Sequence, residues 1–140
     1  MKAGWEVKPL GELAQISSGK SNTKDAVEDG EFAFFDRSKT IKRSNKFLFD
    51  CSALIIPGEG KEFRPKSFDG KFDLHQRAYA IYDFSTAILR DFAFYAIEHN
   101  HEHFQRVAVG ATVKSLRQRH FDNFPIPLPP LEEQRRIVAV

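Results

Sequence analysis

Two glycine-containing stretches carry residue types that could bind phosphates, and each lacks a residue that its motif requires. Gly19-Lys20-Ser21 matches the end of the phosphate-binding loop G-x-x-x-x-G-K-[ST], but the first position of that pattern is Ala14. Without a glycine there, the backbone cannot wrap a phosphate group as the motif needs. Gly58-Glu59-Gly60 would need a third glycine at Phe63 to form a dinucleotide-binding turn. Neither stretch therefore predicts a nucleotide site.

Three histidines in residues 99–103, HNHEH, have the composition of a metal-binding tract. The zinc-protease pattern H-E-x-x-H would begin at His101 and need a histidine at position 105, which is Gln105. His99 and His103 share one face of a predicted helix, but no third ligand stands at ligand spacing. Histidines near the C-terminal end of a helix are also favoured by the helix dipole. We therefore expect no metal and no cofactor.

The single cysteine, Cys51, borders an apolar stretch and has no neighbouring base, which favours a buried structural thiol over a nucleophile. One cysteine rules out an intrachain disulfide framework and suits a reducing cytoplasm. The sequence has no long apolar run and no signal peptide, so we expect no membrane partner. Since no set of side chains converges on a reaction centre, we expect a chain without catalytic residues.

Positive charge is distributed unevenly along the chain. Residues 37–66 contain eight lysines and arginines and three acids, a net charge of +5, whereas the remaining residues include 13 bases and 16 acids. A second stretch, residues 103–121, contains no acid. Clustered positive charge on a nearly neutral domain suggests a face for phosphates, and the alternative is a solvated basic loop. The charge pattern alone leaves both interpretations open.

The elements that must position these side chains follow from apolar periodicity. Strands are predicted at three places, residues 31–36, 53–56 and 77–83. Residues 37–46 are predicted to be an exposed loop or an edge strand. The pair Asp69-Gly70 between two phenylalanines is a hairpin signal. Residues 5–18 are predicted to form a short helix that turns into a strand, with Trp5 as a core anchor.

Helices are predicted mainly in the second half of the chain. One long helix is expected over residues 85–106, with Ser85 or Thr86 as its N-cap and an apolar stripe at three-four spacing. A short helix is expected within residues 115–123, with Leu116 and Phe121 facing inward. A chain of 140 residues is long enough for one domain with a hydrophobic core. The order of the predicted elements indicates an α+β domain.

The stretch at residues 124–140, FPIPLPPLEEQRRIVAV, combines an extended segment with a strong helix start. Four prolines hold the backbone extended up to Pro130, which suits the first turn of a helix. Glu132 and Glu133 place negative charge at the positive end of the helix dipole. Leu131, Ile137 and Val138 begin an apolar stripe for a partner. We therefore divide the chain into a head, residues 1–123, and a hinge with a helix start, residues 124–140.

Four segments in this order resemble the target recognition domain of the DNA specificity subunit of type I restriction-modification systems. They are W-x-x-x-x-L-x-x-L-A-x-I-x-x-G from Trp5 to Gly19, LIIPGEG with the later FDLHQRAY, GATVKSL, and IPLPPLEEQRRIV. The first and third are weak alone, whereas the last is quite specific, and together they cover nearly the whole chain.

The resemblance implies a compact β-rich head of twisted mixed or antiparallel strands with flanking helices, ending in the start of a spacer helix. It implies a non-catalytic subunit with two such domains, each reading one half of a split site on double-stranded DNA. The implied partners are the methyltransferase subunit, the restriction subunit through it, and a second specificity half-subunit. This chain departs from that pattern because it has one domain and only the first turns of one spacer helix.

Read in this way, the loops between strands would carry the DNA contacts. Lysine and arginine would neutralise phosphates, while arginine, lysine and glutamine reach base edges. The candidates are Lys20, Arg37, Lys39, Lys42, Arg43, Lys61, Arg64, Lys66, Gln76, Arg77 and Lys114. For each of them a phosphate contact or plain solvent exposure is the alternative to a base contact.

Two other classes compete with DNA reading. A single recognition domain could act only as a protein–protein interaction module through its helix stub and bind little DNA. A nuclease or methyltransferase head would need a carboxylate–lysine metal site or a cofactor loop, and the sequence contains neither.

Overall fold

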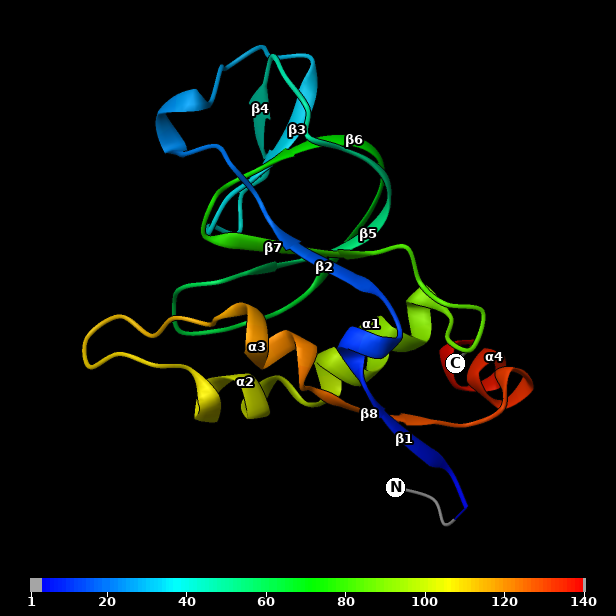
Figure 1. The fold of residues 1–140 in the computed structure, drawn as a ribbon. Coiled ribbons are helices and arrows are strands. Elements are labelled where there is room, and N and C mark those ends of the chain that lie inside the picture. Colours follow the sequence, from blue (N-terminus) through cyan, green and yellow to red (C-terminus); the bar gives the residue numbers. More distant parts are fainter. Residues whose placement is uncertain (1–3, 140) are drawn as a thin grey trace.

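A computed structural model describes residues 4–139, and a six-stranded mixed sheet lies at its centre (Figure 1). Its strands are β2 (Gln15–Ser18), β3 (Phe32–Phe35), β4 (Lys42–Ser44), β5 (Phe49–Pro57), β6 (Lys66–Leu74) and β7 (Ala78–Tyr82). The strand order is β2-β7-β5-β6-β3-β4, and every neighbouring pair is antiparallel except β3 with β6. A separate two-stranded sheet pairs β1 (Glu6–Pro9) with β8 (Pro125–Leu128).

The second half of strand β5, Ala53–Ile56, is apolar and buried on both faces. It pairs with β6 on one side and β7 on the other, and Ala53, Leu54, Ile55 and Ile56 are all buried. Successive side chains of a strand point to opposite faces. Leu54 and Ile56 accordingly join the core beneath the helices, and Ala53 and Ile55 join a second core with Phe35, Phe49 and Phe72.

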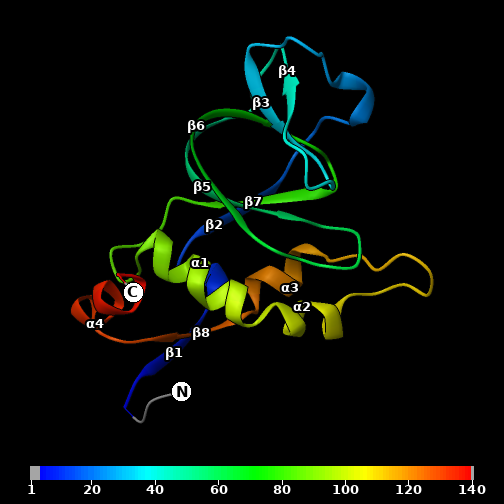
Figure 2. The ribbon, with the colours of Figure 1, turned by 180° about the vertical axis from the view of Figure 1, so that it is seen from behind.

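The helices lie together on one side of the sheet, as both views show (Figures 1 and 2). They are α1 (Arg90–His99), α2 (His101–Val107), α3 (Gln118–Asp122) and α4 (Leu131–Val138), with the short 3-10 helix η1 (Leu10–Glu12). A second 3-10 helix, η2 (Thr23–Asp25), lies apart from them, beside β4. The apolar side chains of the four α-helices and η1 make the first core with β2, β5 and β7. None of the helices described in residues 4–139 has the length and apolar character that crossing a bilayer requires.

Most of the predicted strands and the α+β class are confirmed. The three predicted strands correspond to β3, β5 and β7, and the basic stretch 37–46 contains the edge strand β4. The short helix within residues 115–123 is α3, and both Leu116 and Phe121 are buried. The proline-rich strand and the helix that follows it are β8 and α4.

The predicted hairpin at Asp69-Gly70 is wrong. Both residues lie inside β6, where Asp69 is opposite Ser52 and Gly70 is opposite Cys51 of β5. Gly70 adopts φ +121°, a conformation that glycine tolerates, and the strand continues through it without reversing. Long-range pairing with β5 has therefore overridden the local turn signal.

The predicted long helix over residues 85–106 is also wrong, because the structure contains two helices there with a later start. Ser85 does not cap a helix; its hydroxyl accepts a hydrogen bond from the Ala87 N–H in a turn, and α1 begins only after Leu89. The break falls at Asn100, whose side-chain amide donates to the Ala96 carbonyl at 2.7 Å. Such a side-chain bond competes with the helical pattern of the backbone.

The interpretation of residues 5–18 needs correction at its start. The short helix is only the single 3-10 turn η1, and a strand, β1, precedes it. Trp5 is half-buried and does not belong to the apolar core. Leu10, by contrast, is fully buried, and its N–H donates to the Phe124 carbonyl, which ties the start of the described chain to β8.

Helix α4 is attached to the head by one buried polar side chain. Gln134 is fully buried; its oxygen accepts a hydrogen bond from Leu89 N–H, and its amide donates to the carbonyls of Ala87 and Pro129. Ile126 of β8 is fully buried as well, and Ile137 and Val138 pack against the same core. The division of the chain at residue 123 stays a prediction, although β8 and α4 both contribute to the packing of the head.

Candidate nucleic-acid interface

Four chain connections lie together at one side of the sheet. They are residues 36–41 after β3, residues 58–65 between β5 and β6, the turn 75–77 between β6 and β7, and the loop 108–117 before α3. In Figure 1 the green 58–65 connection and the yellow-to-orange 108–117 loop extend to the left, while α4 in red lies at the right. The predicted DNA-binding loops are therefore on the side of the molecule away from α4.

A groove of about 620 Å³ runs between the 36–41 and 58–65 connections. Five of the predicted DNA-binding residues line it: Arg37, Lys39, Lys61, Arg64 and Lys66. Lys66 donates through Nζ to the carbonyls of Ser38 and Lys39, and burial lowers the pKa of its ammonium group. Arg64 pairs with Glu98 of α1. The contacts of Lys66 and Arg64 thus hold the 36–41 and 58–65 connections in place. The side chains of Lys39 and Lys61 are exposed to solvent.

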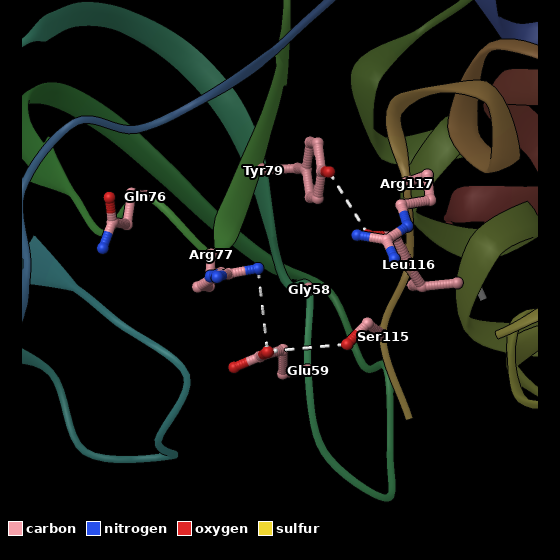
Figure 3. Close-up of a pocket in the computed structure, with 8 residues that line it drawn as sticks. All are labelled: Gly58, Glu59, Gln76, Arg77, Tyr79, Ser115, Leu116 and Arg117. Carbon is pink, nitrogen blue, oxygen red and sulfur yellow. Dashed lines mark hydrogen bonds and ion pairs between the residues drawn. The ribbon is translucent and has the colours of Figure 1, made fainter. Parts of the chain in front are cut away.

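A smaller pocket of about 180 Å³ adjoins this groove and shares Glu59 with it (Figure 3). Gln76 and Arg77, two further predicted residues, lie on one side of it. Ser115, Leu116 and Arg117 of the 108–117 loop lie on the other, and the Tyr79 hydroxyl donates to the Leu116 carbonyl at 3.3 Å. The described structure therefore brings seven of the eleven predicted residues to one continuous, mainly cationic surface.

Glu59 is the acidic residue at the centre of this surface, and sequence reasoning did not select it. One carboxylate oxygen accepts a hydrogen bond from Arg37 Nη1 at 2.6 Å, and the other lies 4.0 Å from Arg77 Nη1. The hydrogen bond from Arg37 chiefly holds the pKa of the Glu59 carboxyl below its usual range, against a smaller opposing effect of burial. Glu59 is therefore ionised at neutral pH. The only sequence signal was its place between two glycines.

The turn that carries Gln76 and Arg77 is built on buried polar groups. His75 is buried, and its Nδ1 accepts a hydrogen bond from the Arg77 N–H at 2.9 Å. The Gln76 N–H donates to the Ser21 carbonyl, and the Ser21 hydroxyl bonds to the buried Asp73 carboxylate. Because every partner is internal, the two exposed side chains of the turn project from a fixed backbone.

We expect folding stability to depend on the charge of His75. Burial and then the nearby Arg37 lower its pKa, against opposing effects of Asp36 and Glu59, and Arg77 adds to the lowering. A histidine whose folded pKa lies below its unfolded value of about 6.5 stabilises the protein fully above that pH and progressively less as the pH falls. The variant His75→Asn keeps a hydrogen-bond acceptor at this position. The difference in unfolding free energy between wild type and this variant should therefore be smaller at pH 5 than at pH 7. Equal pH dependence of the two proteins would contradict this.

The other predicted residues lie elsewhere. Lys42 pairs with the buried Asp36 at 2.5 Å, and Arg43 donates to the carbonyls of Gly30 and Glu31, so both are tied into the β3–β4 edge. Lys20 lines a separate surface hollow beside Leu48 and Tyr82. Lys114 is exposed in the 108–117 loop, where its carbonyl accepts a bond from Gly60 N–H.

The histidine tract and the cysteine also differ from expectation. His99 and His103 fall on two helices, α1 and α2, because the predicted helix is broken between them. In residues 4–139 there is no group of three or more His, Cys, Asp or Glu side chains placed to hold a metal ion. Cys51 is half-buried rather than buried, and burial raises the pKa of its thiol.

The fold and this surface define a binding module: a curved mixed sheet whose loops bring guanidinium and ammonium groups to one side. Residues 2–140 match the family model described as the type I restriction modification DNA specificity domain. The chain belongs to this family, as the resemblance of its motifs indicated.

Several relatives share this similarity over nearly the whole chain. The specificity subunit of the type I restriction enzyme EcoDI from Escherichia coli is 30% identical over 133 residues, which is 95% of this chain and 29% of that protein. A putative type I specificity subunit of Mycoplasma pneumoniae is 26% identical and matches 98% of this chain and 37% of its own length. This chain thus spans about a third of the length of the curated relatives it matches.

Solved structures agree on the fold. The S subunit of the type I restriction-modification system from M. genitalium superposes with a TM-score of 0.81 at 18% identity, over 97% of this chain and 37% of that chain. The HsdS subunit from Thermoanaerobacter tengcongensis gives 0.76 at 20% identity, over 99% and 37%. The predicted α+β head followed by a helix is the fold of these structures.

Proposed function

We propose that this chain reads one half of a split double-stranded DNA target for a type I restriction-modification system. The observation that supports the proposal best is the gathering of seven predicted residues around the groove and pocket that share Glu59. Family membership supports the same role. Enzymatic activity would belong to partner subunits, because a specificity domain directs chemistry that others perform.

This surface would make two kinds of contact with DNA, one kind to phosphates and the other to base edges. The exposed ammonium groups of Lys39 and Lys61 can neutralise phosphates at the rim, which fixes the register of the protein without reading sequence. The guanidinium groups of Arg37 and Arg77 can donate in pairs to a guanine edge, and Gln76 can pair with adenine. Gln76 and Arg77 start from an internally bonded backbone, and Arg37 is restrained by its pair with Glu59, so these side chains lose less freedom on binding.

The partners we propose are the methyltransferase subunit, the restriction subunit through it, and a second specificity half-subunit. Leu131, Ile137 and Val138 remain candidates for that contact. Ile137 and Val138 line a groove of about 630 Å³ together with Phe94, Tyr95 and polar residues that include Glu98, the partner of Arg64. The apolar and aromatic part of this groove is also the observation that favours the alternative role, a protein–protein module with little DNA binding.

Lys39→Ala should weaken DNA binding by a similar factor on every sequence. A phosphate contact carries no base information, so its loss should also make the slope of log K against log salt shallower by about one unit. The measurement is a salt titration with a random-sequence duplex, and the matched control is Lys8→Ala on β1, remote from the groove. Unchanged affinity and slope in Lys39→Ala would place that loop away from DNA. Absence of any duplex binding by wild type at low salt would favour the protein–protein module.

A further inference from the structure

Glu59 holds an unusual place for a carboxylate on a surface proposed to bind phosphates. It is the only acidic residue that lines the small pocket. Asp36 and Glu62 also line the larger groove, but Asp36 is buried against Lys42, and Glu62 is exposed. Negative charge at the centre of a DNA-binding surface repels the phosphate backbone there. Glu59 therefore does not contribute to general affinity for DNA, because its charge weakens that affinity.

The backbone on both sides of Glu59 is fixed by hydrogen bonds. Gly58 N–H donates to the Arg77 carbonyl at 2.7 Å, and Gly60 N–H donates to the Lys114 carbonyl at 3.1 Å. Glu59 itself forms an antiparallel bridge with Ser115. A Cβ atom on residue 58 would lie 2.4 Å from the Arg77 carbonyl oxygen, so this close approach requires glycine. The carboxylate is consequently held in one position between two loops.

The side chains around Glu59 face outward from that position. The side chain of Glu59 is 17% exposed, whereas those of Arg37 and Arg77 are 47% and 53% exposed. Each guanidinium has five N–H donors in a planar fork, and the contact with Glu59 occupies only part of that fork. The remaining donors of both arginines are free to meet a base edge or a phosphate, with their direction set by the shared carboxylate.

We propose that Glu59 is a positioning residue that determines sequence specificity by aiming Arg37 and Arg77 together at base edges. Its charge also disfavours a phosphate at the same point, so DNA in an incorrect register gains less from the two arginines. The cognate sequence compensates for the weaker attraction of phosphates by accepting directed hydrogen bonds from the two arginines, whereas other sequences do not. This inference rests on the proposed DNA-reading function and adds how the surface distinguishes one sequence from another.

The test compares affinity for two duplexes in the specificity subunit that carries this domain, assembled with its modification subunit. One duplex is the sequence selected by the wild-type complex from a random pool, and the other has only this domain's half-site scrambled. Glu59→Gln should bind the scrambled duplex more tightly and the selected one more weakly, so that their affinity ratio falls at least about tenfold. Glu62→Gln removes the same charge from the same groove and should leave the ratio unchanged.

A second variant distinguishes the effect of the carboxylate's position at residue 59 from the effect of its charge. Glu59→Asp keeps the negative charge but shortens the side chain, so it should lower the ratio while binding to the scrambled duplex stays at the wild-type level. The inference is overturned if Glu59→Asp keeps the wild-type ratio, or if Glu59→Gln raises both affinities equally, as simple charge removal would. A wild-type complex that selects no sequence at this half-site would instead defeat the proposed function itself.

Discussion

The double variant Arg37→Ala, Arg77→Ala should bind its selected duplex about 30-fold more weakly than wild type, or weaker still. Each directed guanidinium contact to a base is worth about 1–3 kcal/mol, so two of them contribute at least about 2 kcal/mol. Both side chains are about half exposed and converge on Glu59, so their removal eliminates the central donors of the surface. The measurement is equilibrium binding of the selected and scrambled duplexes at fixed salt.

The matched control is Arg135→Ala, Arg136→Ala, which removes two exposed arginines from α4 on the other side of the molecule. This control should keep wild-type discrimination between the two duplexes, with complex assembly checked by size-exclusion chromatography. If both double variants lose affinity to the same extent, the loss reflects net charge, and the loops around Glu59 do not read the sequence.

Gln134→Ala should destabilise the fold by about 2 kcal/mol or more. Gln134 is fully buried, and its side chain satisfies the Leu89 N–H and the carbonyls of Ala87 and Pro129. The Pro129 carbonyl is buried and the Leu89 N–H is partly buried, and each such group left without a partner costs about 1–3 kcal/mol. The variant should also loosen α4 from α1, because two of these three bonds, those with Ala87 and Leu89, connect the helix to the segment before α1. Urea unfolding of both proteins gives the difference.

Gln105→Ala is the control for this stability prediction. Gln105 is exposed, and its amide donates only to the Lys61 carbonyl, so its replacement should change the unfolding free energy by no more than about 0.5 kcal/mol. Equal losses in the two variants would mean that the buried position of Gln134 contributes nothing particular to the attachment of α4.

Local sequence signals predicted the elements that are specified by neighbouring residues or by a strongly apolar run. The run at Ala53–Ile56 is apolar enough to require a strand covered on both faces, and the structure covers both. The prolines before Leu131 and the acids after it define a strand followed by a helix start, which are β8 and α4. The DNA-binding candidates came from the family resemblance together with donor side chains in predicted loops, and most of them lie on one surface because neighbouring strands deliver their loops to the same side.

The missed features depend on partners far apart in the sequence. Glu59 meets Arg37, Arg77 and Ser115, which lie 22, 18 and 56 positions away, and no local pattern encodes that convergence. No local pattern singles out Gln134, yet it is buried and bonded to residues 45 and 47 positions earlier. The hairpin signal at Gly70 failed for the same reason, because pairing with β5 outweighs a two-residue preference.

Sequence reading by the surface around Glu59 can be tested by selecting bound sequences from a random duplex pool with the subunit carrying this domain, assembled with its modification subunit. We expect that wild type enriches one short half-site, and that Arg37→Ala, Arg77→Ala loses that enrichment while the Arg135→Ala, Arg136→Ala control retains it. Enrichment of the same half-site by the Arg37→Ala, Arg77→Ala variant would contradict the assignment of sequence reading to the surface around Glu59.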